Sequence, residues 1–145
     1  MHSADKDGRD VGEIVGRAPL GVRATRDADT LLALQANCVL YAPVAANPAE
    51  VRRILESGKN VVTPLGWFYP FDSKSVAEME AACRKGGVTL HGTGIHHGGI
   101  TERFPLAISS LSRAITHVRA EEWSDIRTYG APAVIGEVLR FGKTP

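Results

Sequence analysis

The sequence is poor in the residues that would connect it to several common protein classes. Two of its 145 residues are cysteine and 6% are aromatic, so neither a disulfide scaffold nor a stacking surface for nucleic-acid bases is expected. An excess of one charge sign is also absent, because 17 basic and 16 acidic side chains leave a net charge of +1. A chain without a strong electrostatic field is a poor match for nucleic acid or an anionic membrane.

Long hydrophobic segments are missing as well. The longest apolar run, residues 38–46, falls far short of the roughly 20 residues that a membrane-spanning helix needs. The first ten residues are polar and charged, unlike a signal peptide. We therefore expect a cytoplasmic protein in which Cys38 and Cys83 are reduced thiols in the core. The hydrophobic fraction of 43% is typical of a globular domain.

Short apolar runs alternate with amphipathic stretches, which is typical of a parallel α/β sheet. The nearly continuous apolar run at residues 38–42 predicts a strand that is covered on both faces. Asn47 and Pro48 are favourable first residues of a helix, and Gly58 is a favourable residue just after its end. Residues 60–63 then predict the next strand, in the order expected for a crossover between parallel strands.

The same criteria predict the remaining elements. Before this unit we expect a short helix at residues 10–15, a weak strand at 21–25 and a helix capped by Asp27 or Asp29. After it we expect a helix that Asp72 or Ser73 opens, with Val76, Met79 and Cys83 on one face, and a strand at 88–91. The last predicted elements are a helix over residues 100–115 that Pro105 kinks or breaks, a strand at 117–123 and a helix at 132–141.

A glycine-rich segment, Gly92-Thr93-Gly94-Ile95-His96-His97-Gly98-Gly99, follows the predicted strand at 88–91. A strand, a glycine-rich turn and a helix are the parts of an anion-binding loop. The dinucleotide fingerprint, however, needs a third glycine where His97 stands and an acidic residue about 20 residues further on. Three interpretations remain open: a pyrophosphate loop, a purely structural turn, and a loop at the nicotinamide and substrate end of a nucleotide-binding domain.

Histidines near this segment raise the question of a metal site. His91, His96 and His97 lack the short fixed spacings of zinc ligands, so no metal site is predicted. His96 or His97 is a candidate general acid, because a histidine near neutral pH can protonate an imine or orient a carboxylate. The alternative is that both are polar loop residues without a catalytic task.

Residues 92–100 resemble the dihydrodipicolinate reductase-like amine dehydrogenases, a family that includes 2,4-diaminopentanoate dehydrogenase. In that family a Gly-Thr-Gly stretch and a following Pro-Gly step join the nucleotide domain to the catalytic domain. The resemblance continues over nearly the whole chain, through residues 2–13, Asn47-Pro48, residues 129–132 and residues 141–145. Two positions depart from the family: His97 replaces a proline, and Ala133 stands where an acidic residue is expected at a helix N-terminus.

The resemblance implies a Rossmann-type domain and hydride transfer between NAD(P) and a carbon bearing an amine or imine. Residues 1–95 would be an incomplete nucleotide-binding domain and residues 96–145 the start of an α+β catalytic domain with substrate and subunit contacts. By the same resemblance, the cofactor-binding residues are Ser3 and Lys6 near the adenosine ribose and Pro43 and Val44 near the nicotinamide. Gly92, Thr93 and Gly94 belong to the same set, and residues 93–97 would approach the reacting carbon, with His96 and His97 as catalytic candidates.

The first βαβ unit of such a domain, with its GxGxxG turn, has no counterpart in the sequence, so we expect a chain shortened at both ends. Without this unit, residues 22–25 would be detached from the sheet, and the edge of the strand at 38–42 would be exposed. We expect that edge to pair with a second copy of the chain or with a complementing chain. We expect weak NAD(P) binding and little activity from this chain alone. The alternatives are one chain of a split dehydrogenase and a non-enzymatic module that binds a small molecule or a protein.

Overall fold

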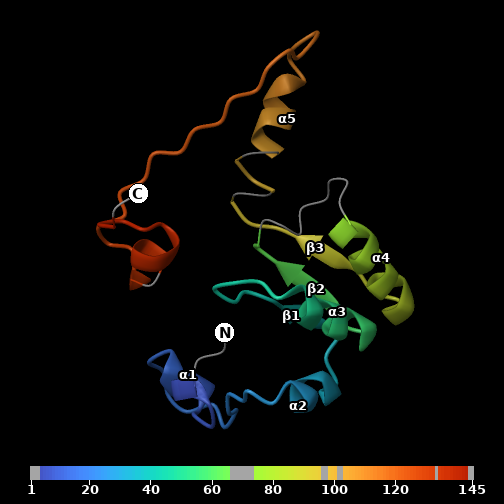
Figure 1. The fold of residues 1–145 in the computed structure, drawn as a ribbon, viewed down its shortest axis with the longest axis vertical. Helices are drawn as coiled ribbons and strands as arrows, with labels where there is room; N and C mark the ends of the chain where they lie inside the picture. Colours follow the sequence, from blue (N-terminus) through green and yellow to red (C-terminus); the bar gives the residue numbers. More distant parts are fainter. Residues whose placement is uncertain (1–3, 66–73, 96–97, 101–102, 133, 144–145) are drawn as a thin grey trace.

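The computed structural model describes residues 4–65, 74–95, 98–100, 103–132 and 134–143. Its centre is a parallel three-stranded sheet in the order β1 (Cys38–Leu40), β2 (Asn60–Thr63), β3 (Leu90–Gly92). Helix α3 (Pro48–Glu56) joins β1 to β2, and helix α4 (Lys74–Gly86) precedes β3 (Figure 1). The predicted parallel α/β arrangement is therefore confirmed, with β3 placed two residues later than expected.

The core lies between one face of the sheet and helices α3 and α4. It consists of buried residues from the end of β1, from β2 and from both helices: Tyr41, Val51, Leu55, Val61, Met79 and Ala82. Cys83 is half-buried against this core, and Met79 and Cys83 share the apolar face of α4, as predicted. Residues 72 and 73, predicted to open α4, lie outside the described residues.

The opposite face of the sheet is not covered by the described residues. Leu40, Val62 and His91 are aligned across the three strands, and Leu40 is 72% exposed. The prediction of a strand covered on both faces is therefore wrong for β1, because both helices pack on the same side. For the same reason Cys38 is exposed and is not a core thiol.

Local interactions explain where α3 begins and how α4 approaches it. The Asn47 side chain accepts a hydrogen bond from the Ala49 N–H at 3.0 Å, and Pro48 is the first helical residue. At the other end, a Cβ on Gly86 would lie 1.9 Å from the carbonyl oxygen of Leu55. Only glycine allows the two helices to come this close. Lys85 also donates to Glu56 at 2.7 Å across the same contact.

The N-terminal residues form a small unit outside the three-stranded sheet (Figure 1). It contains η1 (Ala4–Lys6) and α1 (Val11–Ile14), which lies within the helix predicted at residues 10–15 and is capped by Asp10. The predicted strand at 21–25 is wrong: the segment has one antiparallel bridge, between Asp10 and Arg23. The backbone of residues 22–24 bonds to the backbone of residues 8–11 and not to the three-stranded sheet, so no longer strand pairing forms.

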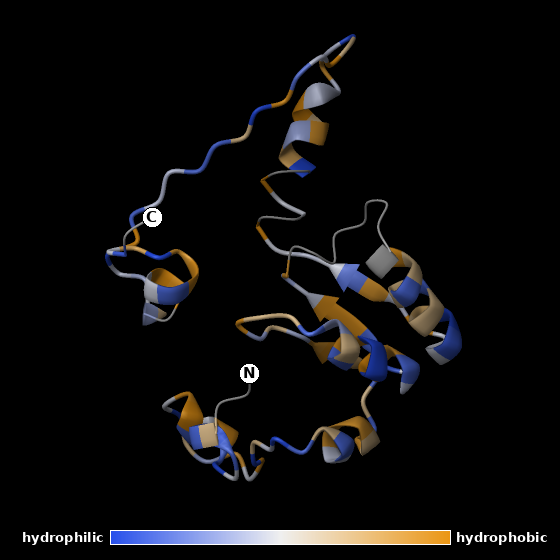
Figure 2. Cartoon of the chain, in the orientation of Figure 1, coloured by the Kyte–Doolittle hydropathy of each residue, from blue (hydrophilic) through white to orange (hydrophobic). Residues whose placement is uncertain are grey.

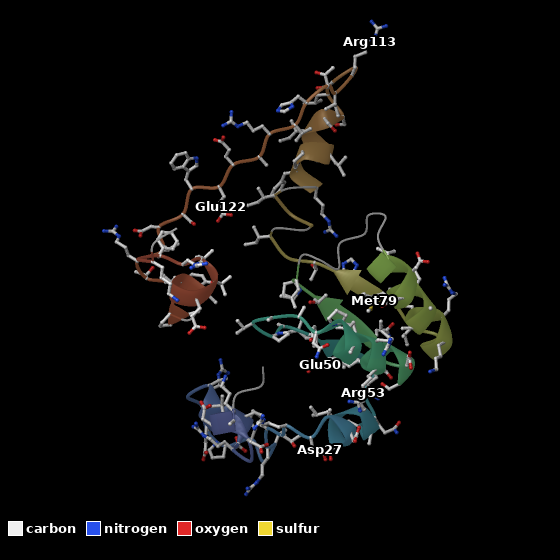
Figure 3. The ribbon with its side chains drawn as sticks, viewed as in Figure 1. Asp27, Glu50, Arg53, Met79, Arg113 and Glu122 are labelled. Carbon is white, nitrogen blue, oxygen red and sulfur yellow. The ribbon has the colours of Figure 1, made fainter. Side chains whose placement is uncertain are left out.

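Helix α2 (Ala28–Ala33) follows and is capped by Asp27, as predicted. Two polar contacts hold α2 against the sheet unit. The Lys59 ammonium donates to the Leu32 carbonyl at 2.6 Å, and Arg53 pairs with Asp29 at 2.5 Å. Figure 3 labels Arg53 on the side of α3 that faces α2.

The last third of the described chain packs loosely. Helix α5 (Arg103–Ser109) is shorter than the predicted helix, and Pro105 lies in its first turn, where proline is tolerated. Residues 117–123 form no strand: they are exposed and pair with none of the strands that the structure describes. The predicted helix at 132–141 is reduced to η3 (Val134–Val138), a wide π-type turn. Figure 2 shows apolar residues along α5 that are not packed against the sheet.

Among the helices that the structure describes, none has the length and apolar character needed to cross a membrane.

Candidate functional site

The carboxyl edge of the sheet is the candidate site. In a parallel sheet all strands end at one edge, and ligands of open α/β folds bind beside that edge. The loop at residues 42–46 leaves β1 there, and residues 93–95 leave β3 there. The two loops begin on either side of β2, which places their starts roughly 10 Å apart.

Apolar side chains are exposed on both loops. Val44 is 69% exposed on the first loop and Ile95 is 65% exposed on the second, and Leu40 precedes the first loop. Figure 2 shows apolar colouring at the turn that follows β1. An uncharged aromatic ring would find an apolar contact surface here, while a phosphate would not.

The first loop is fixed at both of its ends by one tyrosine. The Tyr41 hydroxyl donates to a Glu50 carboxylate oxygen at 2.9 Å and accepts from the Asn47 N–H at 3.0 Å. Tyr41 is only 6% exposed. Burial is the main cause of the raised pKa of its hydroxyl, and the Glu50 carboxylate adds to it. The hydroxyl therefore stays protonated and acts as a donor.

Polar groups of the chain itself already lie at the first turn of α3, where a ligand would bind. Asn47 caps the Ala49 N–H, and the Glu50 carboxylate lies within the same turn, as Figure 3 shows for Glu50. A carboxylate near a helix N-terminus takes the place that an anionic ligand would prefer. This helix end is therefore not a phosphate site.

The second loop folds onto itself. The Ile95 carbonyl accepts hydrogen bonds from the Gly99 N–H at 3.2 Å and the Ile100 N–H at 2.8 Å. Gly94 and Gly98 have φ values of +124° and +128°, which side-chain-bearing residues rarely adopt. Two N–H groups that a phosphate loop would present are thus engaged internally. The geometry favours a turn over a pyrophosphate cradle.

The structure brings five of the predicted cofactor-binding residues to this edge. Pro43 and Val44 lie in the first loop, Gly92 ends β3, and Thr93 and Gly94 begin the second loop. Lys6 is exposed at the end of η1, in the N-terminal unit. Ser3, His96 and His97 lie outside the described residues, so their predicted roles stay predictions.

Three residues of this edge were not anticipated from the sequence. Tyr41 was interpreted only as part of an apolar strand, and Glu50 was not singled out. The available signal was the spacing Asn47-Pro48-Ala49-Glu50, which resembles a capping box and follows a tyrosine by a short loop. Thr63, fully buried at the end of β2, accepts the Leu65 N–H at 3.2 Å and was also missed.

Among the residues that the structure describes, no group of three or more histidine, cysteine, aspartate or glutamate side chains is placed to hold a metal ion.

The chain is similar in sequence to a known enzyme. No protein-family model matches the chain. The chain is 32% identical, over 156 aligned residues, to an amine dehydrogenase of Streptomyces virginiae. The alignment covers 99% of this chain and 42% of that protein, so the chain spans about two fifths of the relative's length. The chain is thus a distant homologue, over nearly its whole length, of an amine dehydrogenase.

Proposed function

We propose that this chain provides the nicotinamide and substrate side of an NAD(P)-dependent oxidoreductase that acts on a carbon bearing an amine or imine. The observation that carries the proposal is the convergence of the 42–46 loop and residues 93–94 at the carboxyl edge of one parallel sheet. Homology to an amine dehydrogenase supports the substrate class. The resemblance of residues 92–100 supports the finer assignment to the dihydrodipicolinate reductase-like branch.

The residues of the edge suit a nicotinamide ring and a neighbouring substrate. Bound NAD(P)H would supply the hydride that reduces an imine carbon. Pro43 and Val44 would contact the nicotinamide, since Val44 is exposed and apolar. Thr93 and Gly94 would line the substrate side, with the Thr93 hydroxyl available to orient a polar group. By sequence alone, His96 or His97 is proposed to donate the proton that the reduced nitrogen takes up.

These residues give less support for a site that binds the phosphate half of the cofactor. The 145 residues contain no GxGxxG turn, the first turn of α3 is capped, and the Gly99 and Ile100 N–H groups are engaged. We therefore propose that the chain alone binds NAD(P) weakly. A second polypeptide segment that pairs with the open edge of β1 would supply the pyrophosphate site.

Fluorescence titration of the purified chain with NADPH tests this proposal. We expect no saturable binding in the micromolar range from the chain alone. Addition of a polypeptide with a strand, a GxGxxG turn and a helix should produce NADPH binding and, with an amine and NADP⁺ as the substrates, formation of NADPH. Saturable micromolar binding by the chain alone would contradict the proposed division of the cofactor site. A complemented complex that binds NADPH but turns over only non-amine substrates would contradict the amine class.

Exposure of the β1 edge favours a second candidate, a module that binds proteins by strand addition. Leu40 is 72% exposed, and residues 37–44 contain no charged side chain that would block pairing. Hydrogen exchange distinguishes the two functions. Protection of β1 by a protein partner, without any nicotinamide effect at residues 93–95, would favour the binding module.

A further inference from the structure

We propose that Tyr41 is the positioning residue for the 42–46 loop, and that its hydroxyl links the end of β1 to the first turn of α3. The inference rests on the proposed function, because this loop is the proposed nicotinamide contact. It adds a role for a side chain that would have no direct contact with the cofactor. The Tyr41 ring is buried in the core, so its position is set by the sheet and not by the loop.

The hydroxyl takes the central place in a modified helix cap. In an ordinary capping box, the acidic residue three positions after the cap accepts the cap residue's own N–H. Here the Tyr41 oxygen lies between the two groups, accepting from the Asn47 N–H at 3.0 Å and donating to Glu50 at 2.9 Å. The loop therefore leaves the tyrosine at residue 42 and returns to the same tyrosine at residue 47.

This arrangement limits the freedom of Pro43 and Val44. A five-residue loop whose two ends meet at one buried side chain has few conformations to lose when a ligand binds. Without the hydroxyl, the Asn47 end would lose its hydrogen bond to the β1 side and would be held by the packing of Ala46 on the core and by the helix that follows. Loop order before binding, and hence affinity at the proposed nicotinamide contact, should depend on this one oxygen atom.

The test compares the wild-type chain with Tyr41→Phe, which keeps the buried ring and removes the hydroxyl. Tyr129→Phe is the matched control, because Tyr129 is 52% exposed in the loosely packed C-terminal region. Amide hydrogen exchange should accelerate about tenfold at Asn47 and over residues 44–46 in Tyr41→Phe, as expected for loss of a hydrogen bond to a charged partner. Exchange at Leu55 and Val61 should stay unchanged.

Substitutions of Glu50 provide a second, independent arm. Glu50→Gln retains an oxygen acceptor for the Tyr41 hydroxyl and should show near wild-type exchange, whereas Glu50→Leu removes only this acceptor and should accelerate exchange less than Tyr41→Phe, because the Asn47 N–H can still donate to Tyr41. The double variant Tyr41→Phe/Glu50→Leu should be no worse than Tyr41→Phe alone, because that substitution already removes both bonds of the hydroxyl. Additive effects, or faster exchange in Tyr129→Phe, would overturn the proposal.

A binding titration tests whether the order of this loop affects the proposed function. Reduced nicotinamide mononucleotide is added, and the amide chemical shift of Val44 reports its binding. The half-saturating concentration should rise several-fold in Tyr41→Phe, while the shift at saturation stays the same. An unchanged half-saturating concentration together with unchanged exchange at Asn47 would overturn the positioning role. If the wild-type chain shows no response to this nucleotide, the proposed function fails, and the exchange measurements alone decide whether Tyr41 orders the loop.

Discussion

The N–H of Thr93 donates to the carbonyl oxygen of Thr63 at 2.9 Å. This hydrogen bond continues the pairing of β3 with β2 beyond Gly92, the last residue of β3. The glycine-rich loop is therefore anchored to the central strand before it turns. Because Thr93 is fixed in this way, the geometry of the loop depends on the backbone of the residues that follow it.

Gly94 is the first of those residues, and its φ of +124° predicts that a side chain is not tolerated there. Gly94→Ala should lower the free energy of unfolding by about 1–3 kcal/mol through backbone strain. Gly130→Ala is the control, since a Cβ at Gly130 would meet no atom within 4 Å, and it should change stability by less than about 0.5 kcal/mol. Urea denaturation of both variants gives the comparison. Equal effects would show that the loop imposes no conformational requirement.

The hydrogen bond from Lys59 to α2 predicts how this helix is attached to the sheet unit. Its side chain is buried, 6% exposed, and donates to the Leu32 carbonyl at 2.6 Å. Lys59→Met keeps the apolar stem and removes this bond, so α2 amides should exchange about tenfold faster, as for loss of one charged hydrogen bond. Lys85→Met removes a different contact, with Glu56, and should leave α2 unchanged. Identical exchange of α2 in all three proteins would refute the attachment.

The hydrogen bonds to the Asp10 carboxylate predict that the N-terminal unit is sensitive to acid. Hydrogen bonds from the N–H groups of Leu20, Gly12 and Gly21 lower the pKa of its carboxyl group below the ordinary 3.8. A lowered folded-state pKa stabilises the unit above the unfolded-state pKa, and this contribution is lost as pH falls through the folded-state pKa. Amide shifts of Leu20 and Gly21 should therefore titrate with a midpoint below 3.8. A midpoint at or above 3.8 would contradict the assignment.

The open edge of β1 predicts concentration-dependent association. The Tyr41 N–H donates to Val62 and the Asn37 carbonyl accepts from Asn60, so the alternate residues Cys38 and Leu40 direct their backbone groups away from β2. Sedimentation velocity should show self-association that Leu40→Lys suppresses by placing a charge on the edge. Leu34→Lys is the control, since Leu34 is 54% exposed outside the sheet. The edge would be excluded as the contact if both variants behaved alike.

Sequence patterns predicted the elements whose formation depends on neighbouring residues. Asn47 and Asp27 cap helices where the sequence places them, and residues 60–63 form the expected strand. These features are local, because the cap and the first turn are a few residues apart. The convergence of Val44 and Gly94 at one edge also followed, since parallel strands end on the same side.

Features that depend on distant partners were predicted less well. The exposure of Cys38 depends on which face of the sheet α3 and α4 cover, and the periodicity of a short apolar run does not reveal this. Residues 117–123 were expected to form a strand, but they are exposed and pair with none of the strands that the structure describes. The Tyr41 hydroxyl was missed because its partners only become neighbours once the β1–α3 loop closes.

The central claim is that the carboxyl edge of the sheet receives the nicotinamide half of a dinucleotide. Amide chemical-shift mapping of the whole chain with reduced nicotinamide mononucleotide, compared with 5′-AMP, tests it most directly. We predict that the nicotinamide nucleotide shifts Val44, Thr93 and Gly94 and that 5′-AMP leaves these three amides unchanged. The claim would be contradicted if the nicotinamide nucleotide left all three unchanged, or if 5′-AMP shifted them equally.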